Sequence, residues 1–392
     1  MTTIEATIDW LVDCGLRSDD VRGLHAGLGE RLVALGVPVR RTFGAMPARH
    51  PQFRAIGWKW AEGAGAVLDR YEHRAVQSEA FQRSPFRYML DSGETKLRRR
   101  LIGRNTPNDF PVLDDLCAEG ATDYYARLVG FTASEAGLSG MVASWISWAA
   151  DGFSDGHIAT IERVLPAYAL ACYRIQLKHT AATLLGAYLG ADAGLRVLSG
   201  ETQRGAVNEL DAALMVTDLR GFTRLADTID GAALVGALNA YHDAVGEAVE
   251  GVGGQILKFL GDGVLATFAL DDGGEAAACG HALDAAVAAL GAVGRVNAAR
   301  AAAGDPTLDL DVALHVGRVM YGNVGSPRRL DFTVIGPAVN EVSRIEPLCK
   351  VLGRRLLMSG RFATACGRPV HSLGFHVLRG VAEPQELFGI PG

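Results

Sequence analysis

Apolar and polar positions along this 392-residue chain repeat with two different periods, which predicts a mixed α/β protein. Short alternating segments, such as "QFRAIGWKWAEG" (52–63) and "GMVASWISWAADGF" (140–153), predict half-buried strands. The longer segment "SDGHIATIERVLPAYALACYRIQL" (154–177) has helical spacing and opens at Ser154 or Asp155, either of which can cap a helix. Pro166 predicts a kink or a helix start within this segment.

A heptad spacing of leucines follows on the same predicted helix. Leu170, Leu177 and Leu184 recur every seven residues, with Tyr173 and Thr180 between them, as on one stripe of a two-stranded coiled coil. A helix that packs on its own domain is the alternative. The position of this helix between two predicted domains favours a connector that forms a dimer. The segment "GADAGLRVLSGETQRG" (190–205) is then expected to break the helix.

The second half of the chain alternates between strand and helix patterns. The apolar strand "AALMVTDLRGF" is expected to end at Asp218, and "TRLADTIDGAALVGALNAYHDAVGEAVE" (223–250) to form a helical stretch. A hairpin, "GGQILKFLGDGVLATF" (253–268), comes next, followed by an alanine-rich helix over 276–302. The strand "LDLDVALHVGRVMYGNVG" and the helix "PAVNEVSRIEPLCK" complete the pattern.

Length and composition agree with more than one globular domain. All five tryptophans precede residue 200, and an alanine- and glycine-rich half follows. We therefore expect a regulatory domain over 1–160, a helical connector over 161–205 and a second domain over 206–392.

Charge and cysteine usage restrict the partners and the compartment. The net charge of −6 gives no general attraction to nucleic acid or acidic membranes, and no uninterrupted apolar stretch is long enough to span a bilayer. The six cysteines are scattered without metal-ligand spacing, which favours reduced thiols in a cytoplasmic protein. One basic run, "TKLRRRLIGR" (95–104), predicts a solvated face, with a contact to an anionic ligand as the alternative.

Two charged residues interrupt the apolar pattern of the predicted hairpin. Lys258 lies within its first strand, and Asp262 occupies the turn between two glycines. Asp218 ends the preceding strand, so the two acids can converge at neighbouring strand ends, where a divalent cation would relieve their repulsion. Taken singly, each acid could instead cap a helix or fill a turn. The backbone amides from Gly221 to Thr223 could receive phosphate oxygens.

A second polar pair lies in the segment "PAVNEVSRIE". Asn340 and Arg344 are four residues apart on a helix that Pro337 can begin, so their side chains share one face. Val339, Val342 and Ile345 can face the core from the same helix. An exposed polar face is the alternative interpretation of the pair.

The segments "TDLRGFTRL", "LKFLGDGVLATF" and "DFTVIGPAVNEVSRIE" resemble the three core motifs of the class III nucleotide cyclases, in the correct order. The resemblance covers about 211–388. It implies a ferredoxin-like mixed sheet with helices, and a homodimer whose active sites lie between two copies of the chain.

The resemblance also implies roles for individual residues. Asp218 and Asp262 match the carboxylates that hold two Mg²⁺ or Mn²⁺ ions, and Lys258 with Thr333 matches the pair that recognises the purine base. Asn340 and Arg344 match the residues that orient the ribose and stabilise the transition state. Other expected substrate contacts are Phe222, Thr223 and, for the terminal phosphates, Arg379.

The expected activity is that of an adenylate cyclase, which converts ATP to 3′,5′-cyclic AMP and pyrophosphate. Lysine at 258 is typical of adenylate cyclases, and glutamate of most guanylate cyclases in this class. Threonine at 333 is a weaker selector than the aspartate of many members, because a hydroxyl can donate or accept a hydrogen bond. A guanylate cyclase and a catalytically silent sensor with a cyclase fold remain the alternatives.

The first domain resembles the GAF and PAS sensor domains over roughly 36–171, through strands flanked by helices and closed by one long helix. The resemblance implies a regulatory domain whose signal the sequence does not identify. Trp58, Trp60, Trp145 and Trp148 could line an apolar pocket, but core positions are the favoured interpretation.

Overall fold

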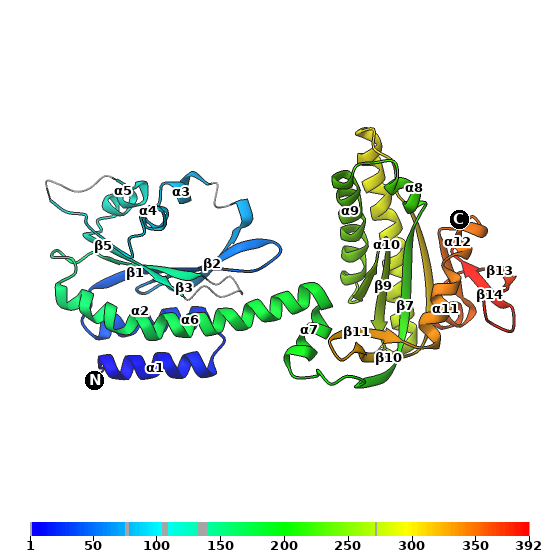
Figure 1. Ribbon diagram of the computed structural model, residues 1–392, viewed down its shortest axis with the longest axis horizontal. Helices are drawn as coiled ribbons and strands as arrows, with labels where there is room; N and C mark the ends of the chain where they lie inside the picture. The colour runs from blue at the N-terminus through cyan, green and yellow to red at the C-terminus, as the bar shows by residue number, and fades with distance from the viewer. Residues whose placement is uncertain (1, 75–77, 104–108, 132–138, 271–272, 392) are drawn as a thin grey trace. The chain divides into compact units, whose positions relative to one another are not determined.

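A computed structural model describes residues 2–74, 78–103, 109–131, 139–270 and 273–391. The chain divides into two compact units, Met1–Ala187 and Tyr188–Gly392, which are coloured from blue to green and from green to red in Figure 1. The division falls inside the segment 161–205, where the sequence predicts a connector. Both units combine helices with a sheet, as the mixed α/β prediction requires.

The first unit contains a six-stranded antiparallel sheet in the order β3-β2-β1-β6-β5-β4. Its strands are β1 (Val39–Pro47), β2 (Phe53–Ala61), β3 (Gly65–Glu72), β4 (Lys96–Arg100), β5 (Asp123–Gly130) and β6 (Gly140–Ser147). The strands predicted within 52–63 and 140–153 are therefore confirmed as β2 and β6.

Helices cover both faces of this sheet (Figure 1). Helices α1 (Ile4–Arg17), α2 (Val21–Ala34) and α6 (Asp155–Leu189) lie on one face, and α3 (Glu79–Gln82), α4 (Pro85–Ser92) and α5 (Pro111–Ala118) on the other. The side chains of Trp58, Trp60 and Trp145 are buried in the core beneath α2 and α6, which confirms the core interpretation for these three.

Helix α6 begins where the sequence predicts, because Ser154 Oγ accepts a hydrogen bond from the amide of His157. The helix continues through Pro166 to Leu189, so the prediction of a helix start at this proline is wrong. Tyr173 and Thr180 pack against the first unit, whereas Leu170, Leu177 and Leu184 are exposed by 63%, 39% and 37%. The leucine stripe is thus partly exposed within the described part of its own chain.

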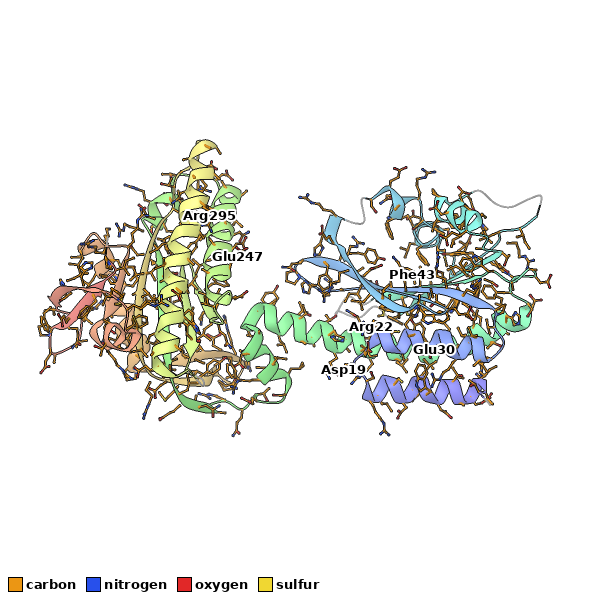
Figure 2. The ribbon with its side chains drawn as sticks, turned by 180° about the vertical axis from the view of Figure 1, so that it is seen from behind. Asp19, Arg22, Glu30, Phe43, Glu247 and Arg295 are labelled. Carbon is orange, nitrogen blue, oxygen red and sulfur yellow. The ribbon has the colours of Figure 1, made fainter. Side chains whose placement is uncertain are left out.

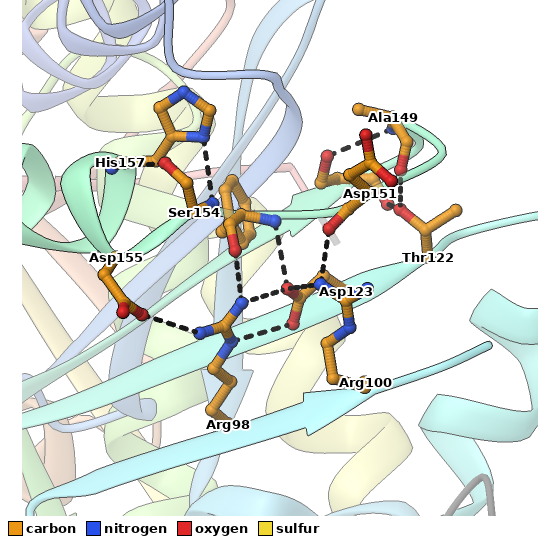
Figure 3. A network of polar contacts seen from close by, with 11 residues as sticks. Arg98, Arg100, Thr122, Asp123, Ala149, Asp151, Ser154, Asp155 and His157 are labelled. Atoms are coloured by element: carbon orange, nitrogen blue, oxygen red, sulfur yellow. Dashed lines mark hydrogen bonds and ion pairs between the residues drawn. The ribbon is translucent and has the colours of Figure 1, made fainter. Parts of the chain in front are cut away.

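The basic run does not form a freely solvated face, contrary to the favoured prediction. Arg98 makes two hydrogen bonds to the fully buried Asp123, and Arg99 pairs with Asp109 on the other side of β4 (2.7 Å). The backbone amide of Phe153 also donates to Asp123, so this network fixes the start of α6 to the sheet edge (Figure 3). Arg104 lies outside the described residues.

The second unit is built on an eight-stranded sheet in the order β13-β14-β12-β10-β7-β9-β8, with β11 paired to β10. All its pairings are antiparallel except that of β10 with β12. The strands are β7 (Val207–Arg220), β8 (Gln255–Leu260), β9 (Gly263–Ala269), β10 (Asp309–Ser326), β11 (Arg329–Ile335), β12 (Leu356–Ser359), β13 (His371–His376) and β14 (Gln385–Gly389).

Alternate residues of β7 face two separate cores, as the two-residue period of a strand requires. One core lies under α9 (Gly231–Glu250), α10 (Gly274–Ala302) and α13 (Gly360–Cys366); Figure 2 labels Glu247 of α9 and Arg295 of the neighbouring α10. The other core lies under α7 (Ala191–Leu198), α11 (Pro337–Ile345) and α12 (Leu348–Val351).

Two boundary predictions in the second half require correction, and one helix was not predicted. The stretch 223–250 is two helices, α8 (Phe222–Ala226) and α9, because Asp230 caps α9 through the amides of Ala232 and Ala233. The predicted break of the long helix within 190–205 is confirmed at Gly190, directly after the end of α6, but residues 191–198 form a further helix, α7, whose apolar side packs on the sheet. Strand β7 extends to Arg220, two residues beyond Asp218.

Helix α10 is long and apolar enough, by length and composition, to cross a membrane. Half of its most apolar 18-residue window is buried inside the second unit, against the sheet and α9. Such burial is typical of the central helix of a globular core.

Candidate active site

Two acidic side chains meet where β7 ends and the β8–β9 hairpin turns. Gly263 follows Asp262 in the turn, and a Cβ atom at Gly263 would lie 2.8 Å from the carbonyl oxygen of Thr217 and 3.6 Å from Asp218 Oδ1. The turn that carries Asp262 is therefore pressed directly against Asp218, and only glycine allows this approach. This contact brings both predicted acids to one point of the sheet.

Four carboxylates share this region with one guanidinium group. Burial, followed by the charges of Asp262 and Asp311, raises the pKa of Asp218 to about 6. Burial, followed by the charges of Asp218, Asp311 and Asp262, raises the pKa of Glu346 to about 7. Arg220 is held by Asp311 through two hydrogen bonds. The excess negative charge is what a divalent cation would neutralise.

Glu346→Gln is expected to stabilise the metal-free chain at pH 8. A folded-state pKa above the unfolded value of about 4.5 makes the folded protein bind more protons, so stability declines as pH rises from about 4.5 to 7. For a half-exposed, water-screened group, removing this penalty should add about 1 kcal/mol to the free energy of unfolding at pH 8 and almost nothing at pH 4.

Urea unfolding of the wild-type and Glu346→Gln chains at both pH values measures this effect. Glu250→Gln, at the exposed end of α9, is the control. A loss of stability at pH 8 in the Glu346→Gln chain would contradict the electrostatic account.

The strand that carries Asp218 is supported from the core side by α9. Thr217 Oγ1 and the hydroxyl of Tyr241 form a hydrogen bond of 2.6 Å, and both residues are buried. His242, the next residue of α9, packs its ring 4.4 Å from the ring of Phe259 in the β8–β9 hairpin. One helix thus holds both strands whose ends carry the acids.

Lys258 has a partner that the local sequence pattern does not reveal. Its Nζ atom lies 2.6 Å from Asp331 Oδ2 on β11. Thr333 lies two residues further along β11, and therefore on the same face of the strand as Asp331. The ion pair lowers the pKa of Asp331, which keeps a carboxylate beside the ammonium group at the predicted base-recognition position.

Helix α11 carries Asn340 and Arg344, as its spacing predicts. Ala338, Val342 and Ile345 are buried, which leaves Asn340 exposed and Arg344 half-buried on the outer side. A Cβ atom at Gly380 would lie 3.6 Å from Arg344 Nη2, so the guanidinium is next to the turn that also contains Arg379. Arg379 itself is exposed.

The remaining predicted substrate contacts lie at the start of α8. Gly221 has φ = 78°, a left-handed conformation that glycine adopts readily, and it leads from β7 directly into this helix. Phe222 packs partly against the core, and Thr223 is exposed.

The predicted site residues form three groups within one chain: the acids at the β7 end and hairpin turn, the Lys258–Asp331 pair with Thr333, and the outer face of α11 with the Arg379 turn. Over the described residues, no hydrogen bond or ion pair joins Lys258 or Arg344 to either Asp218 or Asp262. All the predicted site residues are thus present in one chain, but no such bond in its described part connects the group of acids to the other two groups.

The acids fit a cation that takes its further ligands from a substrate. Among the residues that the structure describes, no set of three or more histidine, cysteine, aspartate or glutamate side chains is arranged to hold a metal ion. Two partly buried carboxylates, with the pKa of Asp218 raised, leave coordination positions that phosphate oxygens can fill.

Comparison with known protein families agrees with this geometry. Residues 207–360 match the family described as the adenylate and guanylate cyclase catalytic domain. This part of the chain is a class III nucleotide cyclase domain. The match includes β7, the β8–β9 hairpin, β10, β11 and α11, and thus every predicted site residue except Arg379.

Individual relatives of the cyclase domain carry both known and unknown functions. An adenylate cyclase of Anabaena cylindrica is 34% identical over 159 residues, 40% of this chain and 30% of that protein. Adenylate cyclase 1 of Rhizobium meliloti (strain 1021) is 29% identical over 187 residues, 46% of this chain and 28% of that protein. An uncharacterized protein of Mycobacterium tuberculosis (strain ATCC 25618 / H37Rv) is 32% identical over 208 residues, 52% of this chain and 37% of that protein. The chain spans about a third of the length of these relatives.

Solved cyclase structures also resemble this part of the chain. The adenylyl cyclase CyaB from P. aeruginosa is 24% identical with a TM-score of 0.44, over 47% of this chain and 94% of that chain. The guanylyl cyclase Cya2 is 26% identical with a TM-score of 0.42, over 46% and 92%.

Proposed function

We propose that this chain is an adenylate cyclase that converts ATP to 3′,5′-cyclic AMP and pyrophosphate. The observation that carries the proposal is the convergence of Asp218 and Asp262 at one point of a cyclase domain, next to a hairpin strand that presents Lys258. In the reaction, the ribose 3′-oxygen attacks the α-phosphorus, the bond between the α-phosphorus and the oxygen that bridges to the β-phosphate breaks, pyrophosphate leaves, and the hydroxyl proton passes to water.

Asp218 and Asp262 would hold two divalent cations, Mg²⁺ or Mn²⁺, which when bound lower the pKa of the ribose hydroxyl and offset phosphate charge. Arg344 would stabilise the charge that develops on the transferring phosphoryl group, and Asn340 would orient the ribose. Arg379 and the backbone at Phe222 and Thr223 would bind the remaining phosphate oxygens.

Lys258 favours adenine over guanine in this proposal. Its ammonium group can only donate hydrogen bonds, and the ring nitrogen N1 of adenine accepts one, whereas N1–H of guanine donates. Asp331 holds the ammonium group at 2.6 Å, and Thr333 on the same face of β11 can contact the exocyclic amine. With GTP as the substrate, the ammonium group of Lys258 would face the N1–H donor of guanine.

Turnover measurements with the purified chain test the proposed activity. With Mn²⁺ or Mg²⁺ present, ATP should yield cyclic AMP and pyrophosphate in equal amounts, with a higher kcat/KM than GTP. A preference for GTP would favour the guanylate cyclase alternative. No turnover of either nucleotide would support the catalytically silent alternative, although Asp218, Asp262, Lys258, Asn340 and Arg344 are all present.

The active form is proposed to be a homodimer in the cytoplasm, where ATP is available and free thiols such as the six of this chain persist. Over the described residues of one chain, no hydrogen bond or ion pair joins Asp218 or Asp262 to Lys258 or Arg344. A second copy would therefore supply its Lys258 and Arg344 to the two acids of the first. The exposed leucine stripe of α6 supports the same assembly.

Leu177→Glu is expected to weaken the dimer, because a charge would be buried in the middle of the stripe. The dimer dissociation constant should rise about tenfold or more, and specific activity should fall in parallel at low protein concentration. Sedimentation velocity and turnover over a dilution series measure both. Leu68→Glu on β3 is the matched control, since Leu68 is also 39% exposed. Equal dissociation constants for the two variants would contradict a role for the stripe.

The first unit is proposed to regulate the cyclase domain through α6. This helix has 35 residues without interruption, and its last two, Tyr188 and Leu189, belong to the second unit. The Arg98–Asp123 network anchors its first turn, so a rearrangement of the first sheet would reach the helix directly (Figure 3). Equal kinetics for the whole chain and for residues 188–392, with and without candidate ligands, would contradict this proposal.

A further inference from the structure

Arg220 lies two residues after Asp218 on β7, so both side chains project from the same face of the strand. A guanidinium group in this place could pair with the Asp218 carboxylate. It is bound instead by Asp311, which lies directly opposite Asp218 in the β7–β10 ladder. Arg220 Nε donates to Asp311 Oδ2 at 3.0 Å, and Arg220 Nη2 donates to Asp311 Oδ1 at 2.5 Å.

The geometry of this ion pair holds the Arg220 guanidinium in one orientation. Two parallel hydrogen bonds between guanidinium and carboxylate fix the direction as well as the distance. The Asp311 side chain is only 4% exposed and that of Arg220 only 28%, so water screens the pair weakly.

Asp218, by contrast, has no cationic partner. Within the ranges that the structure describes, no lysine, arginine or histidine forms an ion pair with its carboxylate. Asp218 is thus not paired with Arg220, although the two residues lie on the same face of β7.

We propose that Asp311 is a positioning residue of the metal site, which holds Arg220 in a two-bonded ion pair and so keeps Asp218 free to bind a divalent cation. This inference rests on the proposed function, because it takes Asp218 to be a metal ligand. The physical reason is competition: a guanidinium released from Asp311 can rotate to Asp218 and neutralise the charge that attracts the cation.

Manganese binding to the full-length chain tests the inference without relying on turnover. The probe is Mn²⁺ with 3′-deoxy-ATP, which lacks the attacking hydroxyl, and free Mn²⁺ is measured by electron paramagnetic resonance. Asp311→Asn should raise the Mn²⁺ dissociation constant about tenfold or more, since one charge-assisted hydrogen bond changes an equilibrium constant by about this factor. Arg220→Met in the Asp311→Asn background should return the constant to within about twofold of wild type. Arg220→Met alone should not weaken binding, because it places no cation beside Asp218.

Two comparisons isolate the role of Arg220. The double variant contains the same asparagine at 311 as the single variant, so recovered binding cannot come from better folding of that site. Asp284→Asn is the matched control: it releases Arg368 from a two-bonded ion pair on α10, outside the site, and should leave Mn²⁺ binding unchanged.

The outcomes separate this inference from the proposed function. Wild-type affinity in Asp311→Asn, or equally weak binding in the single and double variants, would overturn the inference while leaving the cyclase proposal in place. The second of these results would mean that Asp311 acts as a ligand or only as a structural residue. No Mn²⁺ binding by the wild-type chain would overturn both.

Discussion

A mixture of Asp218→Ala and Arg344→Ala chains is expected to convert ATP to cyclic AMP, although neither variant does so by itself at a comparable rate. Asp218→Ala removes a proposed metal ligand, and Arg344→Ala should lower kcat by about 10²-fold as the loss of one preorganised electrostatic group. If each site takes its acids from one chain and Lys258 and Arg344 from the other, a mixed dimer contains one intact site and one site with both defects.

The size of the recovery can be calculated from random assortment. Equal amounts of the two chains give half mixed dimers, each with one of two sites intact, so activity should return to about a quarter of wild type. Cyclic AMP formation is measured after the dimers have exchanged subunits, and exchange is checked with chains of two different tags.

A second mixture is the control for this experiment. Asp218→Ala with Asp262→Ala places both lesions in the same half of the site, so each site of a mixed dimer keeps one defective acid and activity should not return. Recovery in this control, or none in the Asp218→Ala and Arg344→Ala mixture after proven exchange, would contradict an intersubunit site.

Lys258→Ala is expected to lower kcat/KM for ATP by about 10²-fold, since a hydrogen bond from a charged donor is worth about 1.5–3 kcal/mol. GTP turnover should change much less, because guanine presents a donor at the same place. Asp331→Asn should lower kcat/KM for ATP about tenfold, through loss of the 2.6 Å contact that orients the ammonium group.

The combination of both changes tests whether the two residues act as a unit. Lys258→Ala with Asp331→Asn should be no worse than Lys258→Ala alone, because Asp331 has nothing left to orient. Arg318→Ala, which removes an exposed ion pair with Glu209 on the same sheet, is the control and should leave the ATP to GTP ratio unchanged. Multiplied effects in the double variant would show that Asp331 acts independently of Lys258.

The residues of the site that interrupt an apolar pattern could be predicted from the sequence. Lys258 and Asp262 stand out because a hairpin strand and its turn would otherwise be apolar or glycine, and α11 is confirmed with the one-sided burial that its spacing indicates. Asp331, Asp311 and Glu346 could not be found in this way. Their importance depends on which strands are neighbours, and the local pattern does not encode the order of strands in the sheet.

The errors in the fold have different causes. The helix break before α9 had a signal, since Asp230 precedes glycine and a run of good helix formers, but the apolar spacing on both sides concealed it. Helix α7 was missed because its glycine and short length argue against a helix, and packing of Ala193 and Val197 on the sheet overrides that propensity. Pro166 is accommodated inside α6, because burial of residues on both sides of it stabilises the helix.

Because α6 is continuous, the number of residues between Leu170 and Leu184 matters separately from their identity. Each residue added to an α-helix turns everything beyond it by about 100°, so one insertion between Leu170 and Leu184 would carry the third leucine off the line of the first two. Seven added residues would restore the alignment almost completely. Chimeras that exchange the first unit for another input module should therefore be built in steps of a heptad.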